Sequence, residues 1–361
     1  MDKVRWGIIG AGHIARSFAR DVIALSDAEV LAIGSRSEAK AKKFADELGI
    51  QRAYGSYQQL AEDNDIDVVY IATPHVFHKE QSLLCLNNDK PILVEKPFAI
   101  NSAEAREVIS LARDRKLFCM EAVWMRFVPA MRMVKKLIDD GVIGEVQMIS
   151  ASLGFYNEVD PQSRLYDPNL GGGAVLDLGV YPLSLVVQLM GQPSSISSWA
   201  KIGVTQVDEQ VAAMLNFSDG RSALISANIN ATNQNDAFIM GTKSSIHIEA
   251  PLYRPVKITV RQYNSPIRAM INTHPLANGL YKSQTIRKAY DLFKNLFGRD
   301  RYGNSIKVAC EGNGYGYEAD EVSRCLHAGL YESEIMPLDE TIAVLEIVDA
   351  VREGWFIHDT V

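Results

Sequence analysis

The sequence contains few cysteines, and their spacing does not suit a metal site or a disulfide framework. Cys85, Cys119, Cys310 and Cys325 are scattered over 361 residues without a CxxC pair, so we expect reduced thiols and no metal. Long hydrophobic runs are also missing, because no uninterrupted apolar stretch reaches the roughly 18 residues of a membrane span. We therefore expect no membrane partner.

Positive charge is in the minority as well. The chain has 37 Lys and Arg against 44 Asp and Glu, a formal net charge of -7, whereas nucleic-acid binders usually present a basic field. This balance favours a small-molecule partner over a nucleic acid. The N-terminus enters an apolar strand without a basic-then-apolar leader, so we expect a cytoplasmic protein. Residues 282–301 form a basic amphipathic stretch that we interpret as a solvated face without function.

The chain has the length for two domains and shows two different patterns. From residue 4 to residue 121, short apolar runs alternate with amphipathic helical segments, which predicts an α/β domain with a doubly wound parallel sheet. After residue 122 come longer strand-like runs with turn residues between them, such as those at 218–220, which predict an α+β domain with an antiparallel sheet. Helical patterns return at 127–140, at 173–190 and from Glu318 to the C-terminus. We expect domains at 1–122 and 123–361.

The stretch GIIGAGHIA places a G-x-G-x-x-A pattern directly after the first expected strand. Gly10 permits a tight turn, Gly12 lets backbone N–H groups approach a pyrophosphate, and Ala15 allows close packing of helix on strand. The helix N-terminus, which includes His13 and Ile14, offers its positive end to phosphates. We prefer dinucleotide binding to the alternative of a glycine-rich turn without function.

The tip of the second expected strand reads Gly34, Ser35, Arg36, Ser37. An enzyme that uses NAD usually has an acid here for the ribose diol, and this chain has an arginine between two hydroxyls, which suits a 2'-phosphate. Glu38 comes too late and fits the first turn of the next helix. The sequence therefore predicts NADP(H) rather than NAD(H).

Two further strand ends should face the same crevice. After the third apolar run come Thr73, Pro74 and His75; we expect His75 to line the crevice, while His78 packs a helix, because no third ligand accompanies the two histidines. The fourth run ends in Glu95 and Lys96 before Pro97, which restricts the backbone of Lys96. This step could place a lysine beside the nicotinamide, although an exposed lysine is the more common outcome.

The segment NLGGGAVLDLGVYPLSL, residues 169–185, carries two polar groups on an apolar helical pattern. Asp177 and Tyr181 are four positions apart and share one face, and the glycines before them could let the backbone run close beneath a substrate. An isolated pair would be a solvated acid and a core aromatic. Trp124, Arg126 and Phe127 follow the fifth expected strand at the cleft, where Trp124 could equally stack on a sugar ring or pack between domains.

The ordered set of motifs at 10–15, 95–97 and 171–182 resembles the glucose-fructose oxidoreductase and inositol dehydrogenase family (GFO/IDH/MocA). Within that family, MEAVWMRFVPA at 120–130 and YGYEADEVSRCL at 315–326 resemble the branch of dimeric dihydrodiol dehydrogenases and NADP-linked xylose dehydrogenases. The resemblance implies a Rossmann domain followed by a large open antiparallel sheet, through which subunits pair as a homodimer or homotetramer. Residues 275–305, with an expected extra helix, form a longer loop than in the dihydrodiol branch.

The resemblance also implies oxidation of a secondary or anomeric hydroxyl, or the reverse reaction, with Lys96 and Tyr181 as the catalytic pair and Asp177 ordering the site. Many inositol dehydrogenases carry histidine where this chain has Tyr181, which weakens inositol as the substrate. A phenol with a pKa of about 10 is a poor base near neutrality, and we expect Lys96 to favour its phenolate.

We therefore expect an NADP(H)-dependent oxidoreductase acting on a sugar, polyol or trans-dihydrodiol. The alternatives are a non-catalytic NADP(H)-binding sensor, an inositol-type dehydrogenase that uses NAD, and a methyltransferase that uses the glycine turn for a nucleoside. The methyltransferase fits Arg36 and the step at 95–97 less well.

Overall fold

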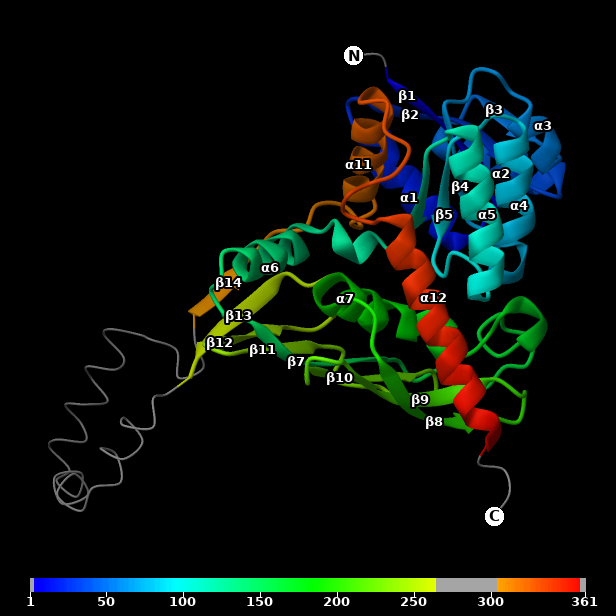
Figure 1. Ribbon diagram of the computed structural model, residues 1–361. Coiled ribbons are helices and arrows are strands. Elements are labelled where there is room, and N and C mark those ends of the chain that lie inside the picture. The colour runs from blue at the N-terminus through cyan, green and yellow to red at the C-terminus, as the bar shows by residue number, and fades with distance from the viewer. Residues whose placement is uncertain (1–2, 264–303, 358–361) are drawn as a thin grey trace, which may run out of the picture.

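The computed structural model describes residues 3–263 and 304–357, which build two sheets (Figure 1). The first sheet has six strands in the order β3-β2-β1-β4-β5-β6, and its strands pair in parallel. They are β1 (Val4–Ile9), β2 (Ala28–Gly34), β3 (Arg52–Tyr54), β4 (Val68–Ile71), β5 (Ile92–Glu95) and β6 (Cys119–Ala122). This order is that of the dinucleotide-binding doubly wound fold, so the predicted Rossmann sheet is confirmed.

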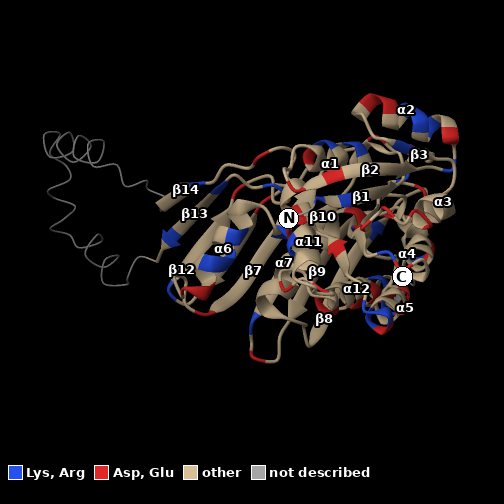
Figure 2. Cartoon of the chain, turned by 90° about the horizontal axis from the view of Figure 1, so that it is seen from above, with Lys and Arg blue, Asp and Glu red and all other residues tan. Residues whose placement is uncertain are grey.

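Helices connect these strands and cover the sheet, as Figure 1 shows. They are α1 (His13–Ile23), α2 (Glu38–Leu48), α3 (Tyr57–Ala61), α4 (His78–Asn87) and α5 (Ser102–Arg115). The strands β4, β5 and β6 are buried along their whole length, which explains why they appear in the sequence as largely apolar runs without polar alternation. Viewed from above, acidic and basic residues intermingle on α2 (Figure 2).

The second sheet has eight strands in the order β14-β13-β12-β11-β7-β10-β9-β8. They are β7 (Val146–Gly154), β8 (Ser195–Ile202), β9 (Asp208–Asn216), β10 (Ser222–Asn228), β11 (Ala237–Gly241), β12 (Ser244–Ile248), β13 (Lys257–Gln262) and β14 (Asn304–Lys307). The predicted antiparallel sheet is confirmed with one correction: β10 pairs with β7 in parallel. The chain leaves β7 through a helix and two further strands before β10 returns, and such a long crossover permits parallel pairing.

The remaining helices are α6 (Pro129–Asp139), α7 (Val180–Met190), α11 (Gly316–His327) and α12 (Leu338–Glu353). The helix expected from Glu318 to the C-terminus is divided at 328–337, where Gly329 adopts a φ of 66° and Pro337 precedes α12. Among the described residues, one stretch, Pro168–Met190, is long and apolar enough to span a membrane, but 89% of its apolar window is buried inside the protein. It is therefore best read as a core helix.

Helices cover one face of the eight-stranded sheet. In Figure 1, α6, α7 and α12 lie above it, and none of the described helices lies below it. The uncovered face carries large exposed side chains, namely Trp199, Met214 and Leu224. The expected extra helix at 275–305 and the basic stretch at 282–301 lie outside the described residues, apart from the start of β14 at Asn304.

Candidate active site

The turn after β1 has the geometry that a bound pyrophosphate needs. Gly10 has a φ of 104°, and a Cβ there would come within 2.6 Å of the Ala72 carbonyl oxygen, so only glycine fits. Gly12 precedes α1 without any side-chain cap on the helix, and a Cβ on it would meet nothing within 4 Å. The first N–H groups of α1 therefore face open space, where a phosphate can accept from them. His13 and Ile14 form the exposed first turn beside this space.

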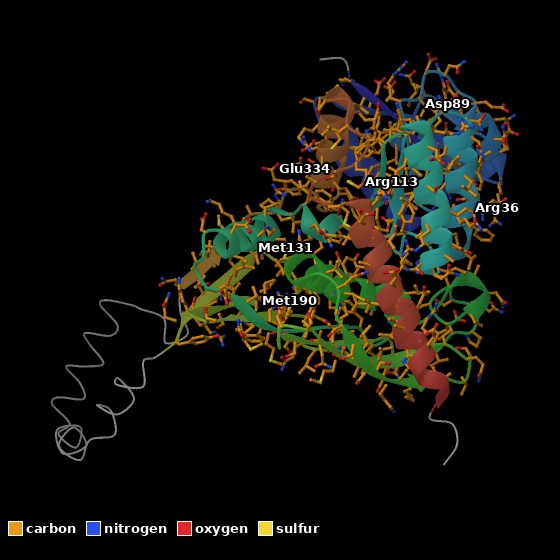
Figure 3. The ribbon with its side chains drawn as sticks, viewed as in Figure 1. Arg36, Asp89, Arg113, Met131, Met190 and Glu334 are labelled. Atoms are coloured by element: carbon orange, nitrogen blue, oxygen red, sulfur yellow. The ribbon has the colours of Figure 1, made fainter. Side chains whose placement is uncertain are left out.

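At the tip of β2, Arg36 is exposed (Figure 3), and its guanidinium carbon lies 5.5 Å from the ring centroid of Phe77. No carboxylate among the described residues forms an ion pair with it. Ser35 is buried, and its Oγ accepts a hydrogen bond from the backbone N–H of Ser37 at 3.3 Å. Glu38 occupies the first turn of α2, as expected. The tip thus offers one available cation and no acid.

The end of β4 leads into a pair of buried histidines. The ring nitrogens of His78 lie 2.8 Å from the carbonyl oxygens of Thr73 and Pro97, so this side chain holds Pro74 and its neighbours against α4. His75 has Nδ1 at 3.1 Å from the Gly171 carbonyl oxygen and Nε2 at 3.4 Å from a nitrogen of Arg164. Burial lowers the pKa of His75 to about 3, so it is neutral at pH 7, with Nδ1 as the donor.

Lys96, Asp177 and Tyr181 meet at the end of β5. Lys96 Nζ donates to the backbone oxygen of Asp177 at 2.7 Å and lies 3.5 Å from its carboxylate. The same ammonium lies 4.9 Å from the ring centroid of Tyr181, a cation–π arrangement. Asp177 and Tyr181 are both buried. Glu95, also buried, accepts from the hydroxyl of Tyr70 and from the backbone N–H of Lys96.

The electrostatics of this cluster differ from the sequence expectation for Tyr181. Burial raises its pKa well above 10, and the nearby Glu95 and Tyr315 add to the rise. The pKa of Tyr181 thus moves away from the expected phenolate: burial and the acids oppose ionisation, and Lys96 lies over the ring. Burial also disfavours ionised Asp177, but the charges of Lys96 and Arg164 outweigh it and hold the pKa of Asp177 well below its usual value.

Trp124 belongs to this cluster, whereas Arg126 and Phe127 do not. Its indole N–H donates to the hydroxyl of Tyr181 at 2.9 Å. Arg126 does not lie at the cleft as expected, which is the first correction. It is fully buried and donates to Ser184, to the Ile335 carbonyl and to Glu340, so it ties the chain after β6 to α7 and α12.

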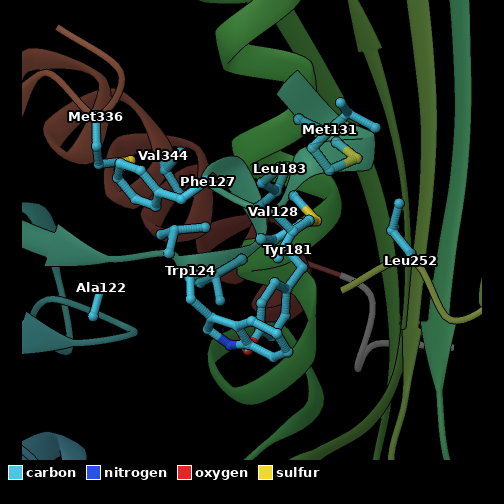
Figure 4. Packing of buried hydrophobic residues seen from close by; sticks show 14 of the residues in the cluster. Ala122, Trp124, Phe127, Val128, Met131, Tyr181, Leu183, Leu252, Met336 and Val344 are labelled. Atoms are coloured by element: carbon cyan, nitrogen blue, oxygen red, sulfur yellow. Dashed lines mark hydrogen bonds between the residues drawn. The ribbon is translucent and has the colours of Figure 1, made fainter. Parts of the chain in front are cut away.

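Phe127 is the second correction. Figure 4 shows it beside Met336 and Val344, while Trp124 lies against Tyr181. Phe127 is 4% exposed and packs in the core, because the short helical turn Trp124–Arg126 directs successive side chains to different sides of the chain.

The structure gives the glycines at 171–173 a role different from the expected close approach of backbone to a substrate. A Cβ on Gly172 would come within 2.9 Å of three carbonyl oxygens of the preceding loop. Gly173 has a φ of 119°, and a Cβ there would collide with the carboxylate of Asp208. That carboxylate accepts from the N–H of Val175 at 2.7 Å. The glycines therefore let this protein's own backbone pack closely, and the helix that carries Asp177 follows from them.

Sequence reasoning missed several residues around the cluster. Arg164, on the loop between β7 and α7, donates to the Asp177 carboxylate at 2.9 Å. The ring centroids of Tyr315 and Tyr253 lie 4.9 Å and 5.7 Å from that of Trp124. Tyr315 opens the quoted motif at 315–326, which was an available signal; Arg164 lies in a polar loop that contains no motif.

Comparisons with known proteins identify the family to which this fold belongs. The model of the oxidoreductase family with an NAD-binding Rossmann fold matches residues 4–123, and the GFO/IDH/MocA C-terminal domain matches residues 131–247. The trans-1,2-dihydrobenzene-1,2-diol dehydrogenase of Xenopus tropicalis is 36% identical over 352 residues, covering 96% of both chains. The mouse (Mus musculus) protein of the same name is 34% identical over 355 residues, covering 97% of this chain and 96% of its own.

Solved structures share the whole fold at lower identity. A 3-ketoreductase from Actinomadura kijaniata, in complex with NADP and TDP-benzene, has a TM-score of 0.78 at 23% identity, with 98% of each chain covered. An aldose-aldose oxidoreductase from Caulobacter crescentus, complexed with glycerol, has a TM-score of 0.78 at 20% identity, again with 98% of each chain covered. At this identity the likeness shows the fold, and function has to be argued from the site.

Proposed function

Because this chain belongs to the GFO/IDH/MocA family of oxidoreductases, we propose that it is an NADP(H)-dependent oxidoreductase of a sugar, polyol or trans-dihydrodiol. The reacting group is a secondary or anomeric alcohol, or the corresponding carbonyl. The observation that carries the proposal is the meeting of Lys96, Asp177 and Tyr181 at the carboxyl end of β5. The dihydrodiol dehydrogenases, about a third identical over nearly the full chain, support the substrate class.

The cofactor, when bound, supplies or accepts the hydride. The residues proposed to hold it are Gly10, Gly12, His13 and Ile14 at the phosphates, Ser35 and Arg36 at the 2'-phosphate, and Thr73, Pro74, His75, Glu95 and Lys96 toward the nicotinamide. The open space over Gly12 supports this assignment, as does Arg36, which packs on Phe77 and has no carboxylate ion pair among the described residues. Arg36 is also the reason to prefer NADP(H) over NAD(H).

In carbonyl reduction, Tyr181 acts as the general acid and donates its hydroxyl proton to the substrate oxygen. Its raised pKa keeps that proton in place until the reaction begins. The tyrosinate that forms is stabilised by the Lys96 ammonium over the ring and by the Trp124 N–H at the oxygen. Alcohol oxidation runs through the same groups in reverse. Asp177 holds Lys96 in position through its backbone oxygen and its carboxylate.

Substrate contacts are proposed for residues around the phenol. Asp177 and Tyr181 would bind the reacting hydroxyl or its neighbour. Trp124 has its indole committed to Tyr181, so we assign it a positioning role. Tyr253, partly exposed and 6.2 Å from the Tyr181 ring centroid, offers an apolar face to a sugar ring or cyclic diol.

Three further statements remain proposals. The domain boundary falls between residues 122 and 123, where β6 ends. The enzyme acts in the cytoplasm. It forms a homodimer or homotetramer through the uncovered sheet face that carries Trp199, Met214 and Leu224; light scattering after size exclusion measures this directly.

The enzyme proposal is tested with a panel of aldoses, inositols and trans-dihydrodiols incubated with NADP+ and followed at the NADPH absorbance. At least one aldose or dihydrodiol should be oxidised. If NADPH binds tightly and no member of the panel, in either direction, is converted, the chain is a sensor. Turnover of inositol with NAD+ alone would support the inositol-type alternative, and displacement of NADPH by S-adenosylmethionine would support the methyltransferase.

A further inference from the structure

A separate cavity of about 770 Å³ lies behind the glycine segment and contains none of the cluster residues Lys96, Asp177 and Tyr181. It is formed by β8, the turn into β9, the C-terminal end of α12 and the loop before α7, elements that lie together in Figure 1. Its lining includes Pro168, Gly172, Gln206, Asp208, Arg352 and Trp355. The volume is within the range of small-molecule sites.

The cavity presents hydrogen-bond donors that the described residues leave partly unused. Arg352, in the last turn of α12, donates one Nη1–H to the Ile100 carbonyl oxygen at 3.2 Å. None of the carboxylates in residues 3–263 and 304–357 pairs with its guanidinium. Trp355 has a buried Nε1–H without an acceptor in the same part of the chain. Two donors at one cavity favour an acceptor-rich occupant.

The acid in the cavity does not cancel this preference. Asp208 is 3% exposed, and one of its oxygens already accepts the N–H of Val175. Burial raises the pKa of Asp208 to about 6, while backbone N–H groups and the charge of Arg352 oppose this rise, so the carboxyl is mainly ionised at pH 7 and its charge is directed at the backbone of the glycine segment. Arg352 donates one N–H to a backbone carbonyl and keeps further N–H groups for a ligand, which favours an anion with bidentate geometry.

We propose that this cavity is a second ligand site, for a small sugar carrying a carboxylate or phosphate group. The guanidinium of Arg352 takes the anion, the indole of Trp355 takes a ring hydroxyl or ring face, and Gln206 lies at the rim. The site goes beyond the proposed function and does not depend on it, since binding can be measured without turnover.

The cavity is also connected to the active site through one side chain. Asp208 accepts a hydrogen bond from the N–H of Val175, two residues before Asp177, and its carboxylate lies directly beside Gly173. A ligand that hydrogen-bonds Asp208 changes the support of the turn that carries Asp177. Occupancy should therefore shift kcat or KM of the active site.

The test is calorimetric titration of the full chain with glucose 6-phosphate, glucuronate and, as the neutral comparison, glucose. At least one anion should bind, glucose should bind at least about tenfold more weakly, and Arg352→Gln should weaken anion binding by about tenfold or more. Arg115→Gln is the matched control, because Arg115 pairs with Asp89 on the first domain. Trp355→Phe, which removes the N–H alone, is the second variant and should also weaken binding.

Both variants should bind NADPH as the parent does, which shows that they are folded. The phosphate and carboxylate probes decide between the two anion types. Absence of heat with both anions overturns the site, as does equal anion binding by the parent, Arg352→Gln and Trp355→Phe. Unchanged kcat and KM at a saturating anion concentration overturn the connection to Asp177.

Discussion

The substitution Tyr181→Phe separates the chemical from the structural contribution of one hydroxyl. Trp124 is 5% exposed and donates its indole N–H to that hydroxyl at 2.9 Å. Removing the acceptor leaves a buried donor unsatisfied, which costs about 1–3 kcal/mol of the free energy of unfolding. Removing the general acid should lower kcat by roughly 10²–10⁴-fold. NADPH affinity should not change, because neither residue touches the phosphate turn.

The assay combines urea unfolding, NADPH titration and steady-state turnover on the same preparations. The matched control is the double variant Trp124→Phe with Tyr181→Phe, which has no orphan donor and should lose less stability than the sum of the two single variants. It should be as inactive as Tyr181→Phe. Turnover of Tyr181→Phe within a few-fold of the parent would refute the assignment of the acid, and unchanged stability would refute the buried hydrogen bond.

Three other perturbations follow from the same geometry. Arg36→Ala should weaken NADP(H) binding at least about tenfold while NAD(H) binding stays the same, because the substitution removes a contact with the 2'-phosphate, which NAD(H) lacks. Equal losses in fluorescence titrations would contradict the preference. Asp177→Asn should lower the free energy of unfolding by roughly 1–3 kcal/mol at neutral pH, since it leaves Lys96 without its carboxylate partner and half-exposed Arg164 limits the cost. The folded pKa of Asp177 is lowered, so this difference should be complete above the unfolded pKa of about 3.9 and shrink as the pH falls below it; a constant difference down to pH 2 would be the contrary result. Gly173→Ala combines a φ of 119° with a collision and should cost roughly 2–4 kcal/mol in thermal unfolding, more than Gly220→Ala, where φ is 87° and a Cβ meets nothing within 4 Å; equal costs would exclude the collision with Asp208.

Much of the fold could be predicted because the first domain is made of local patterns. Apart from the short β3, the strands of its parallel sheet are largely buried and apolar and each is followed by a helical segment, and the turn at Gly10 and Gly12 has a sequence signature. The parallel pairing of β7 with β10 could not be predicted, because it depends on where a distant strand returns. The short strands β3, β11 and β14 carry too few residues for a pattern.

The site shows the same division between local and long-range information. Lys96, Asp177 and Tyr181 were accessible because two motifs contain them, and the fold brings these motifs to one sheet edge. Arg126 was assigned to the cleft from its position after β6, but its hydrogen bonds come from α7, α12 and the loop before α12, which no local pattern reveals. Arg164 lies in a loop whose path is set by Gly172 and Gly173.

The most direct measurement of hydride transfer at this site uses a substrate from the panel that carries deuterium on the carbon to be oxidised. After incubation with NADP+ and the enzyme, mass spectrometry should find one deuterium at C4 of the NADPH, and Tyr181→Phe should form the same labelled product far more slowly. NADPH that forms without deuterium, or label transfer by Tyr181→Phe at the parent rate, would contradict hydride transfer assisted by Lys96 and Tyr181.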